Sequence, residues 1–209
     1  EFKERTYLGT TLSVGESVKS LGYFYSSAGF ATFLNRGRTE QGMLSIRTKY
    51  ISNLVLIGRY RIRNFLEVDY TRGFDRYLDE SLVFNCENGF SGFRNDSIRG
   101  AQRLSVSIES VLFSPFNFYG FKFAVFGFAD LGYLFGTNEF VGSGEYLSAI
   151  GLGIRIRNDN LILNTLQIRL GFFPNLPLYS SVNHLFVSGE QLLKPYNFEP
   201  GPPSTLPFR

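Results

Sequence analysis

The chain has 209 residues, of which 44% are hydrophobic and 17% aromatic, and this composition excludes an intrinsically disordered protein. The net charge is +3, but the arginines are spread along the chain and form no exposed cluster, so nucleic acid is not expected as a partner. The single cysteine, Cys86, excludes an intrachain disulfide and a cysteine-based zinc site. No uncharged apolar run of roughly 18 residues occurs, so a membrane would be crossed by a barrel and not by a helix.

Apolar and polar residues alternate with a period of two along most of the chain, and this pattern predicts an all-β, antiparallel fold. The run from Arg59 to Tyr70 is the clearest, because its charged residues occupy one face and its apolar residues the other, a separation that helical spacing cannot produce. In chain order, we predict strands over residues 6–15, 22–34, 42–51, 59–70, 101–113, 121–135, 149–157, 161–173 and 185–192.

Residues typical of turns separate these runs, and most of the connections are short. Turns are predicted at 35–41, 52–53, 114–117 and 158–160, with a longer loop at 136–145. The proline-rich tail 194–209 cannot join a β-ladder, because proline has no N–H to donate. The strands therefore occupy residues 1–193.

One connection, residues 72–100, is much longer than the others, and loops of this length usually have a function. Its second part, from Asn88 to Gly100, reads NGFSGFRNDSIRG and mixes glycines, phenylalanines, arginines and an aspartate. This composition predicts a loop that folds back into the molecule. The residues of interest are Gly89, Gly92, Phe93, Arg94, Asn95, Asp96, Arg99 and Gly100.

The alternation fits two architectures. In a soluble sandwich or lipocalin the apolar face points inward, whereas in an outer-membrane barrel it faces lipid and the polar face lines the lumen. Three features favour the membrane: arginine-rich polar faces of mixed charge, aromatic residues near strand ends, and apolar runs of about 9 to 14 residues, long enough to cross a bilayer. The expected lumen-lining charges are Arg59, Arg61, Arg63, Glu67, Asp69, Lys122, Arg155 and Arg169.

From residue 87 to residue 173 the sequence resembles the BamA/TamA superfamily of outer-membrane barrels, which includes two-partner-secretion transporters. GFSGFRND resembles the loop motif of this family, RLSVSIESVLF the strand after the loop, FAVFGFADLGYLF the next strand, and AIGLGIRIRNDNLILNTLQIRLGFF the closing hairpin. The resemblance implies that the chain is the C-terminal part of a sixteen-stranded transmembrane β-barrel. The count of about nine predicted strands agrees with a part of a larger barrel, because single-chain bacterial barrels normally have an even number.

In this family the loop enters the lumen, and its arginine pairs with acidic residues on the inner wall. The resemblance therefore implies a lumen lock between Arg94 and Asp130 or Glu109, with a charge-assisted contact that fixes the loop. Arg99, which is followed by Gly100, is a second candidate for the motif arginine.

No pattern in the chain predicts an enzyme. His184 is the only histidine, which argues against a metal site and a Ser-His-Asp triad, so no catalytic residue, metal or cofactor is expected. The expected function is to insert or translocate client proteins at the cell outer membrane. The expected partners are outer-membrane lipid, client outer-membrane or secreted proteins, and accessory lipoproteins or periplasmic domains. The alternative is a barrel that serves as membrane anchor or passive pore for an N-terminal soluble domain.

Overall fold

The computed structural model describes residues 5–35, 38–74, 82–84, 95–136, 144–158, 165–176 and 183–192. Every regular secondary-structure element in these residues is a β-strand, so the prediction of an all-β fold is confirmed. No helix that could span a membrane occurs in this part of the chain. The predicted tail 194–209 and Cys86 lie outside the described residues.

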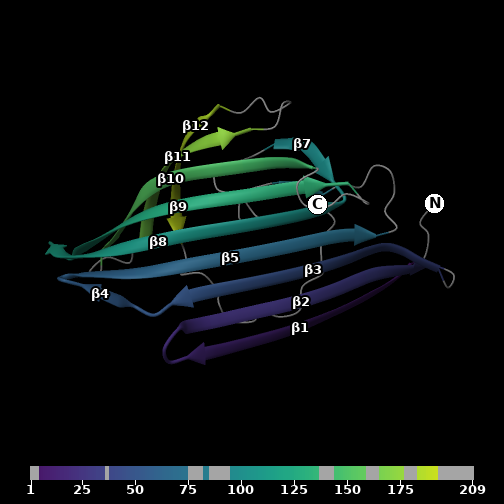
Figure 1. The fold of residues 1–209 in the computed structure, drawn as a ribbon, viewed down its shortest axis with the longest axis horizontal. Helices are drawn as coiled ribbons and strands as arrows, with labels where there is room; N and C mark the ends of the chain where they lie inside the picture. Colours follow the sequence, from purple (N-terminus) through teal and green to yellow (C-terminus); the bar gives the residue numbers. More distant parts are fainter. Residues whose placement is uncertain are drawn as a thin grey trace.

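Most of the strands form one antiparallel sheet of ten strands, called the main sheet here. It follows the order β1-β2-β3-β5-β8-β9-β10-β11-β12, and β4 pairs with β5 beyond the end of β3. Figure 1 shows these strands side by side, with β1 and β12 at opposite borders. Among the described residues these two strands do not pair, so the sheet is not closed. The bounds are β1 Thr6–Val18, β2 Gly22–Asn35, β3 Arg38–Ser52, β4 Val55–Ile57, β5 Tyr60–Phe74, β8 Gln102–Phe118, β9 Phe121–Phe135, β10 Glu145–Asn158, β11 Thr165–Asn175 and β12 Leu185–Leu192.

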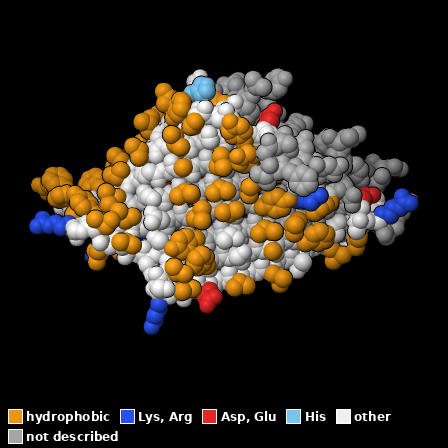
Figure 2. Space-filling view, viewed as in Figure 1, with side chains coloured by type: hydrophobic (Ala, Val, Ile, Leu, Met, Phe, Trp, Pro, Cys, Tyr) orange, Lys and Arg blue, Asp and Glu red, His pale blue; other side chains and the backbone are white. Residues whose placement is uncertain are grey.

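The polar face of the main sheet is more buried than its apolar face. On β11, Gln167 is 0% and Arg169 9% exposed, whereas Leu170 is 57% exposed. The polar face is the inner face, which carries Arg47, Asp69, Arg103, Glu109, Asp130, Gln167 and Arg169. The apolar face is the outer face, with Leu8, Leu12, Ile46, Ile108, Leu112, Val125, Ile150, Leu152, Ile154, Ile168, Leu170 and Val187. Figure 2 looks onto the outer face, where hydrophobic side chains spread across the sheet and charged ones lie toward its borders.

The main sheet curls toward its inner face. Glu109 on β8 and Arg169 on β11 are three strands apart, and their long side chains meet over the inner face, with Glu109 Oε2 and Arg169 Nη2 3.5 Å apart. Glycines at inner-face positions make room for large rings on the neighbouring strand. A Cβ on Gly153 would lie 2.3 Å from Cζ of Phe126, so this ring lies directly over the glycine. Ring and glycine together fill the concave side.

Residues 72–100 are not one continuous loop, and this part of the prediction is wrong. β5 continues to Phe74, and β6 (Leu82–Phe84) pairs with β7 (Asn95–Gly100) in a second, two-stranded sheet. Leu82 is 2% exposed and packs against residues of the inner face, among them Leu134 and Phe173. The short apolar segment 82–84 therefore brings β6 onto the concave side of the main sheet.

Further predictions are corrected by the structure. Residues 35–41 were expected to form a turn, but β2 includes Asn35 and β3 begins at Arg38. Residues 114–117 were expected to form a turn, but β8 continues through them to Phe118, with a register shift between Phe113 and Asn117 that accommodates Pro115. The tight turn follows at Tyr119 and Gly120, both with positive φ. Arg59 was expected in a strand, but it lies in the turn between β4 and β5 and is exposed.

Candidate functional site

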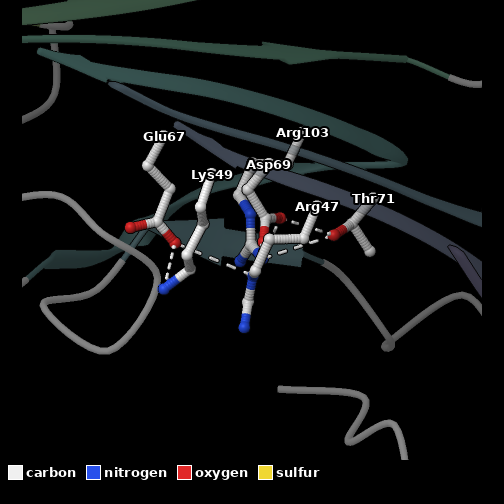
Figure 3. Close-up of polar contacts among 6 residues, drawn as sticks. All are labelled: Arg47, Lys49, Glu67, Asp69, Thr71 and Arg103. Atoms are coloured by element: carbon white, nitrogen blue, oxygen red, sulfur yellow. Dashed lines mark hydrogen bonds and ion pairs between the residues drawn. The ribbon is translucent and has the colours of Figure 1, made fainter. Parts of the chain in front are cut away.

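The first group of ion pairs on the inner face is the Asp69 cluster, formed by Arg47 on β3, Asp69 and Thr71 on β5, and Arg103 on β8 (Figure 3). Arg47 stands directly opposite Asp69 in the β3–β5 register, and its Nε donates to Asp69 Oδ2 at 2.7 Å. Thr71 Oγ1 donates to Asp69 Oδ1 at 3.2 Å, and Arg103 Nη2 lies 3.7 Å from the same oxygen. Asp69 and Arg103 are both buried, so their charges are removed from bulk water and depend on these partners.

A second pair lies beside the Asp69 cluster, one inner-face position along the same two strands. Lys49 stands opposite Glu67, and its Nζ lies 3.0 Å from Glu67 Oε1. Arg47 Nε is also 3.8 Å from that oxygen. Figure 3 shows the Lys49 and Glu67 side chains extending together from the main sheet, next to the Asp69 cluster. The inner face of β3 and β5 is therefore connected by alternating charges.

The Glu109 cluster joins β8 to β10 and β11, which are two and three strands away in the main sheet. Arg155 approaches Glu109 with both terminal nitrogens: Nη2 donates to Oε2 at 2.8 Å, and Nη1 lies 2.7 Å from Oε1. Arg169 Nη2 is 3.5 Å from Oε2, and Arg155 Nε donates to Gln167 Oε1 at 2.6 Å. One carboxylate on β8 thus faces two guanidinium groups, one from β10 and one from β11.

Two aromatic rings on β9 form the floor of the Glu109 cluster. The guanidinium carbon of Arg155 lies 4.4 Å from the ring centroid of Phe126, and that of Arg169 lies 5.3 Å from the centroid of Phe128. Cations stack favourably on aromatic faces, and more so where water is excluded. The rings therefore hold the two arginines in the positions from which they reach Glu109.

The expected lumen lock is only partly within the described residues. Arg94, the motif arginine, lies outside them with Gly89, Gly92 and Phe93. Its two expected partners are on the inner face and buried: Asp130 accepts a hydrogen bond from Ser107 Oγ, and Glu109 binds Arg155. The other expected loop residues, Asn95, Asp96, Arg99 and Gly100, lie in β7. The lock itself stays a prediction.

Most of the expected lumen-lining residues lie at inner-face positions. Glu67, Asp69, Arg155 and Arg169 belong to the ion pairs described above. Arg61, Arg63 and Lys122 occupy inner-face positions nearer to the short turns at Gly58 and Tyr119. Arg59 is the exception, because it lies in a turn.

The predicted site did not include several residues that the structure places in these clusters: Arg47, Lys49, Thr71, Arg103, Gln167, Phe126 and Phe128. The period-two pattern already assigned Arg103 and Gln167 to polar faces, so a signal was present. What was missing was the register, which decides which polar residues face one another.

The described residues support binding and electrostatic roles. They contain no group of three or more histidine, cysteine, aspartate or glutamate side chains that could hold a metal ion. The ion pairs cross-link β3 to β5 and β8, and β8 to β10 and β11, so they stiffen the inner face of the main sheet.

Comparison of the chain with protein-family models, with curated proteins and with solved structures gave no match.

Proposed function

We propose that the main sheet is part of the wall of a transmembrane β-barrel in the outer membrane, with the outer face toward lipid and the inner face toward the lumen. The observation that carries this proposal is the reversed polarity of the sheet. Leu12, Leu152 and Leu170 are 74%, 65% and 57% exposed, while Asp69, Arg103 and other charged residues are buried. In water this arrangement would expose an extensive apolar surface, whereas lipid would cover it.

The strand lengths support the same proposal. A strand tilted by about 45° crosses a bilayer in about 9 to 11 residues. The strands β1, β3, β8 and β11 have 13, 15, 17 and 11 residues. The open borders at β1 and β12 agree with a part of a larger barrel, because a lone open sheet in lipid would leave backbone N–H and C=O groups without partners.

Within this class we propose the assembly or secretion type, in which the barrel inserts client proteins into the outer membrane or translocates them across it. Support comes from the resemblance in the loop and the following strands, and from β6, which packs onto the inner face through Leu82 as a lumen segment would. The second candidate is a barrel that serves as anchor or passive pore for an N-terminal soluble domain. The reversed polarity fits both candidates equally.

Depletion of the protein in its native cells separates the two candidates. For an assembly or secretion barrel, we expect the levels of other outer-membrane or secreted proteins to fall, while an anchor or pore would leave them unchanged. Fractionation tests the membrane proposal itself, since the protein should remain in the outer-membrane fraction after a carbonate or urea wash. Recovery of the folded protein in buffer without detergent would refute both candidates.

The lumen lock is tested by exchanging its charges. We expect Arg94→Asp and Asp130→Arg each to destabilise the folded barrel, and the double exchange to restore part of the loss, because a direct pair shows coupling in a double-mutant cycle. Glu67→Arg with Arg94→Asp is the matched control on another inner-face carboxylate. If the control pair shows the same restoration, Arg94 does not pair specifically with Asp130.

A further inference from the structure

The inner face is strongly basic at one end of the main sheet. This end, called the short-turn end, carries the two-residue turns Gly58–Arg59 and Tyr119–Gly120. Arg61 and Arg63 on β5 occupy consecutive inner-face positions there. Lys122 on β9 and Arg157 on β10 stand directly opposite each other on the same face. Four cations from three strands therefore share this part of the wall.

The orientation of the two β5 arginines follows from the register. β5 pairs with β8 without interruption from Arg61↔Phe113 to Arg72↔Gln102, so Arg61 and Arg63 lie on the same face as the buried Asp69. Arg63 is opposite Val111, which is 0% exposed and belongs to the inner-face aromatic cluster. Both arginine side chains thus belong to the inner face and not to the outer, apolar one.

These two arginines differ from the other inner-face arginines in their partners. Arg47 and Arg155 are bound to carboxylates at 2.7 Å. In contrast, neither Arg61 nor Arg63 forms an ion pair or hydrogen bond with any described residue. A guanidinium group without an acceptor is a favourable site for an anionic group from outside the sheet.

We propose that Arg61 and Arg63 form a docking site for an acidic polypeptide segment in extended conformation. Their side chains are two residues apart on one strand, about 6.6 Å along its axis, which is also the spacing of alternate side chains in an extended peptide. Two exposed apolar residues lie directly opposite Arg61, Leu56 on β4 and Phe113 on β8, 69% and 37% exposed. The site therefore offers two carboxylate contacts with apolar contacts on either side.

This inference deepens the proposed function and rests on it, because short turns of outer-membrane barrels face the periplasm. The short-turn end would then be the mouth through which a client or an accessory domain approaches. A lipid headgroup fits less well, since lipid covers the outer face and the arginines lie on the inner one. The acidic segment would be recognised before it reaches the Asp69 and Glu109 clusters, whose charges are already paired.

The test is binding of a fluorescent peptide of alternating glutamate and serine to the complete protein in nanodiscs of neutral lipid, followed by fluorescence anisotropy. We expect Arg61→Gln with Arg63→Gln to weaken binding by about tenfold or more, and Lys19→Gln, an exposed cation in the β1–β2 turn, to leave it unchanged. A peptide with glutamine in place of glutamate should not bind. Binding to the unchanged protein should weaken as salt is raised.

Equal binding by the Arg61/Arg63 double variant, or by the glutamine peptide, overturns the inference. So does displacement of the peptide by millimolar inorganic phosphate or by anionic lipid in the nanodisc, which would identify a phosphate site. If the glutamine double variant does not fold, the double variant Arg61→Lys with Arg63→Lys and the salt titration of the unchanged protein decide. Lysine retains the charge of arginine but cannot contact a carboxylate with two nitrogens, so we expect the lysine variant to bind the peptide more weakly. If the unchanged protein fractionates with the membrane but does not bind the peptide, only this inference is refuted, whereas failure of the unchanged protein to fractionate with the membrane refutes the proposed function.

Discussion

The two faces of the main sheet are built by the same strands but obey opposite rules. On the outer face, large apolar side chains such as Leu152 are exposed. On the inner face, Arg169 and Glu109 are buried and contact each other, and Arg169 also contacts the rings of β9. A soluble sheet with one solvated face shows the reverse distribution. The difference supports the proposal that the outer face lies in apolar surroundings, and it assigns the ion pairs to the inner face.

Glycines also have different surroundings on the two faces. Gly153 on the inner face has no space for a Cβ, because Phe126 and the carbonyl of Ile168 occupy it. Gly127 on the outer face has only ordinary contacts, the nearest at 3.5 Å. Inner-face glycine is therefore required by packing, whereas outer-face glycine is a gap in an apolar surface.

The largest effect is expected where a buried carboxylate holds two arginines. Glu109→Gln leaves the Arg155 and Arg169 guanidinium groups close together without their shared counter-charge, and removing one partner of a buried pair costs about 3 to 5 kcal/mol. We expect a loss of this size in the free energy of unfolding, measured by denaturant titration of the detergent-solubilised protein. Glu16→Gln, at an exposed position of β1, is the control and should change stability by less than about 0.5 kcal/mol. Equal effects of the two substitutions would show that the inner-face pairing is not structural.

The next effect compares neighbouring residues that point to opposite faces. Leu12 and Thr11 on β1 are both exposed, so a soluble protein would tolerate lysine at either position. In a membrane wall Leu12→Lys places a charge in lipid and costs about 2 to 4 kcal/mol near the bilayer centre, whereas Thr11→Lys faces a wet lumen. Folding into lipid vesicles, followed by protection from protease, measures the difference. If both variants fold equally well, the outer face does not contact lipid.

A smaller effect is expected from adding one methyl group to each kind of glycine. Gly153→Ala forces the Phe126 ring away from its place under Arg155, and overpacking of this kind costs about 1 to 3 kcal/mol. Gly127→Ala meets only ordinary contacts and should be neutral or slightly stabilising. Denaturant midpoints of the two variants give the comparison, and a destabilisation of the same size at Gly127 would contradict the assignment of the two faces.

The strands were largely predictable from the sequence, because a period of two is a local signal. β9 and β12 have the predicted bounds, Phe121–Phe135 and Leu185–Leu192. The errors arose where local chemistry misleads. Pro115 indicated the end of a strand, but a bulge lets β8 continue past it. β6 and β7 were missed because such short segments, with a loop-like composition, become strands only by pairing with each other.

The candidate site was predictable as a face but not as a set of contacts. Alternation placed Glu109, Arg155 and Arg169 on polar faces, and this required no knowledge of the fold. That they meet depends on the strand register, which places them at nearby inner-face positions of β8, β10 and β11. Sequence alone does not state the register, so the contact across three strands could not be predicted.

The smallest effect tests whether the inner face is wet. The Lys49 and Glu67 side chains are 15% and 28% exposed, and their atoms Nζ and Oε1 are 3.0 Å apart. A double-mutant cycle with Lys49→Met and Glu67→Gln should give a coupling of about 0.5 to 1 kcal/mol, typical of a partly hydrated pair. In a water-filled lumen this coupling should fall as salt is raised from low to molar concentration, because mobile ions screen accessible charges. A coupling that does not change with salt would mean that the inner face is a dry core, and the lumen assignment would then fail even if the outer face lies in lipid.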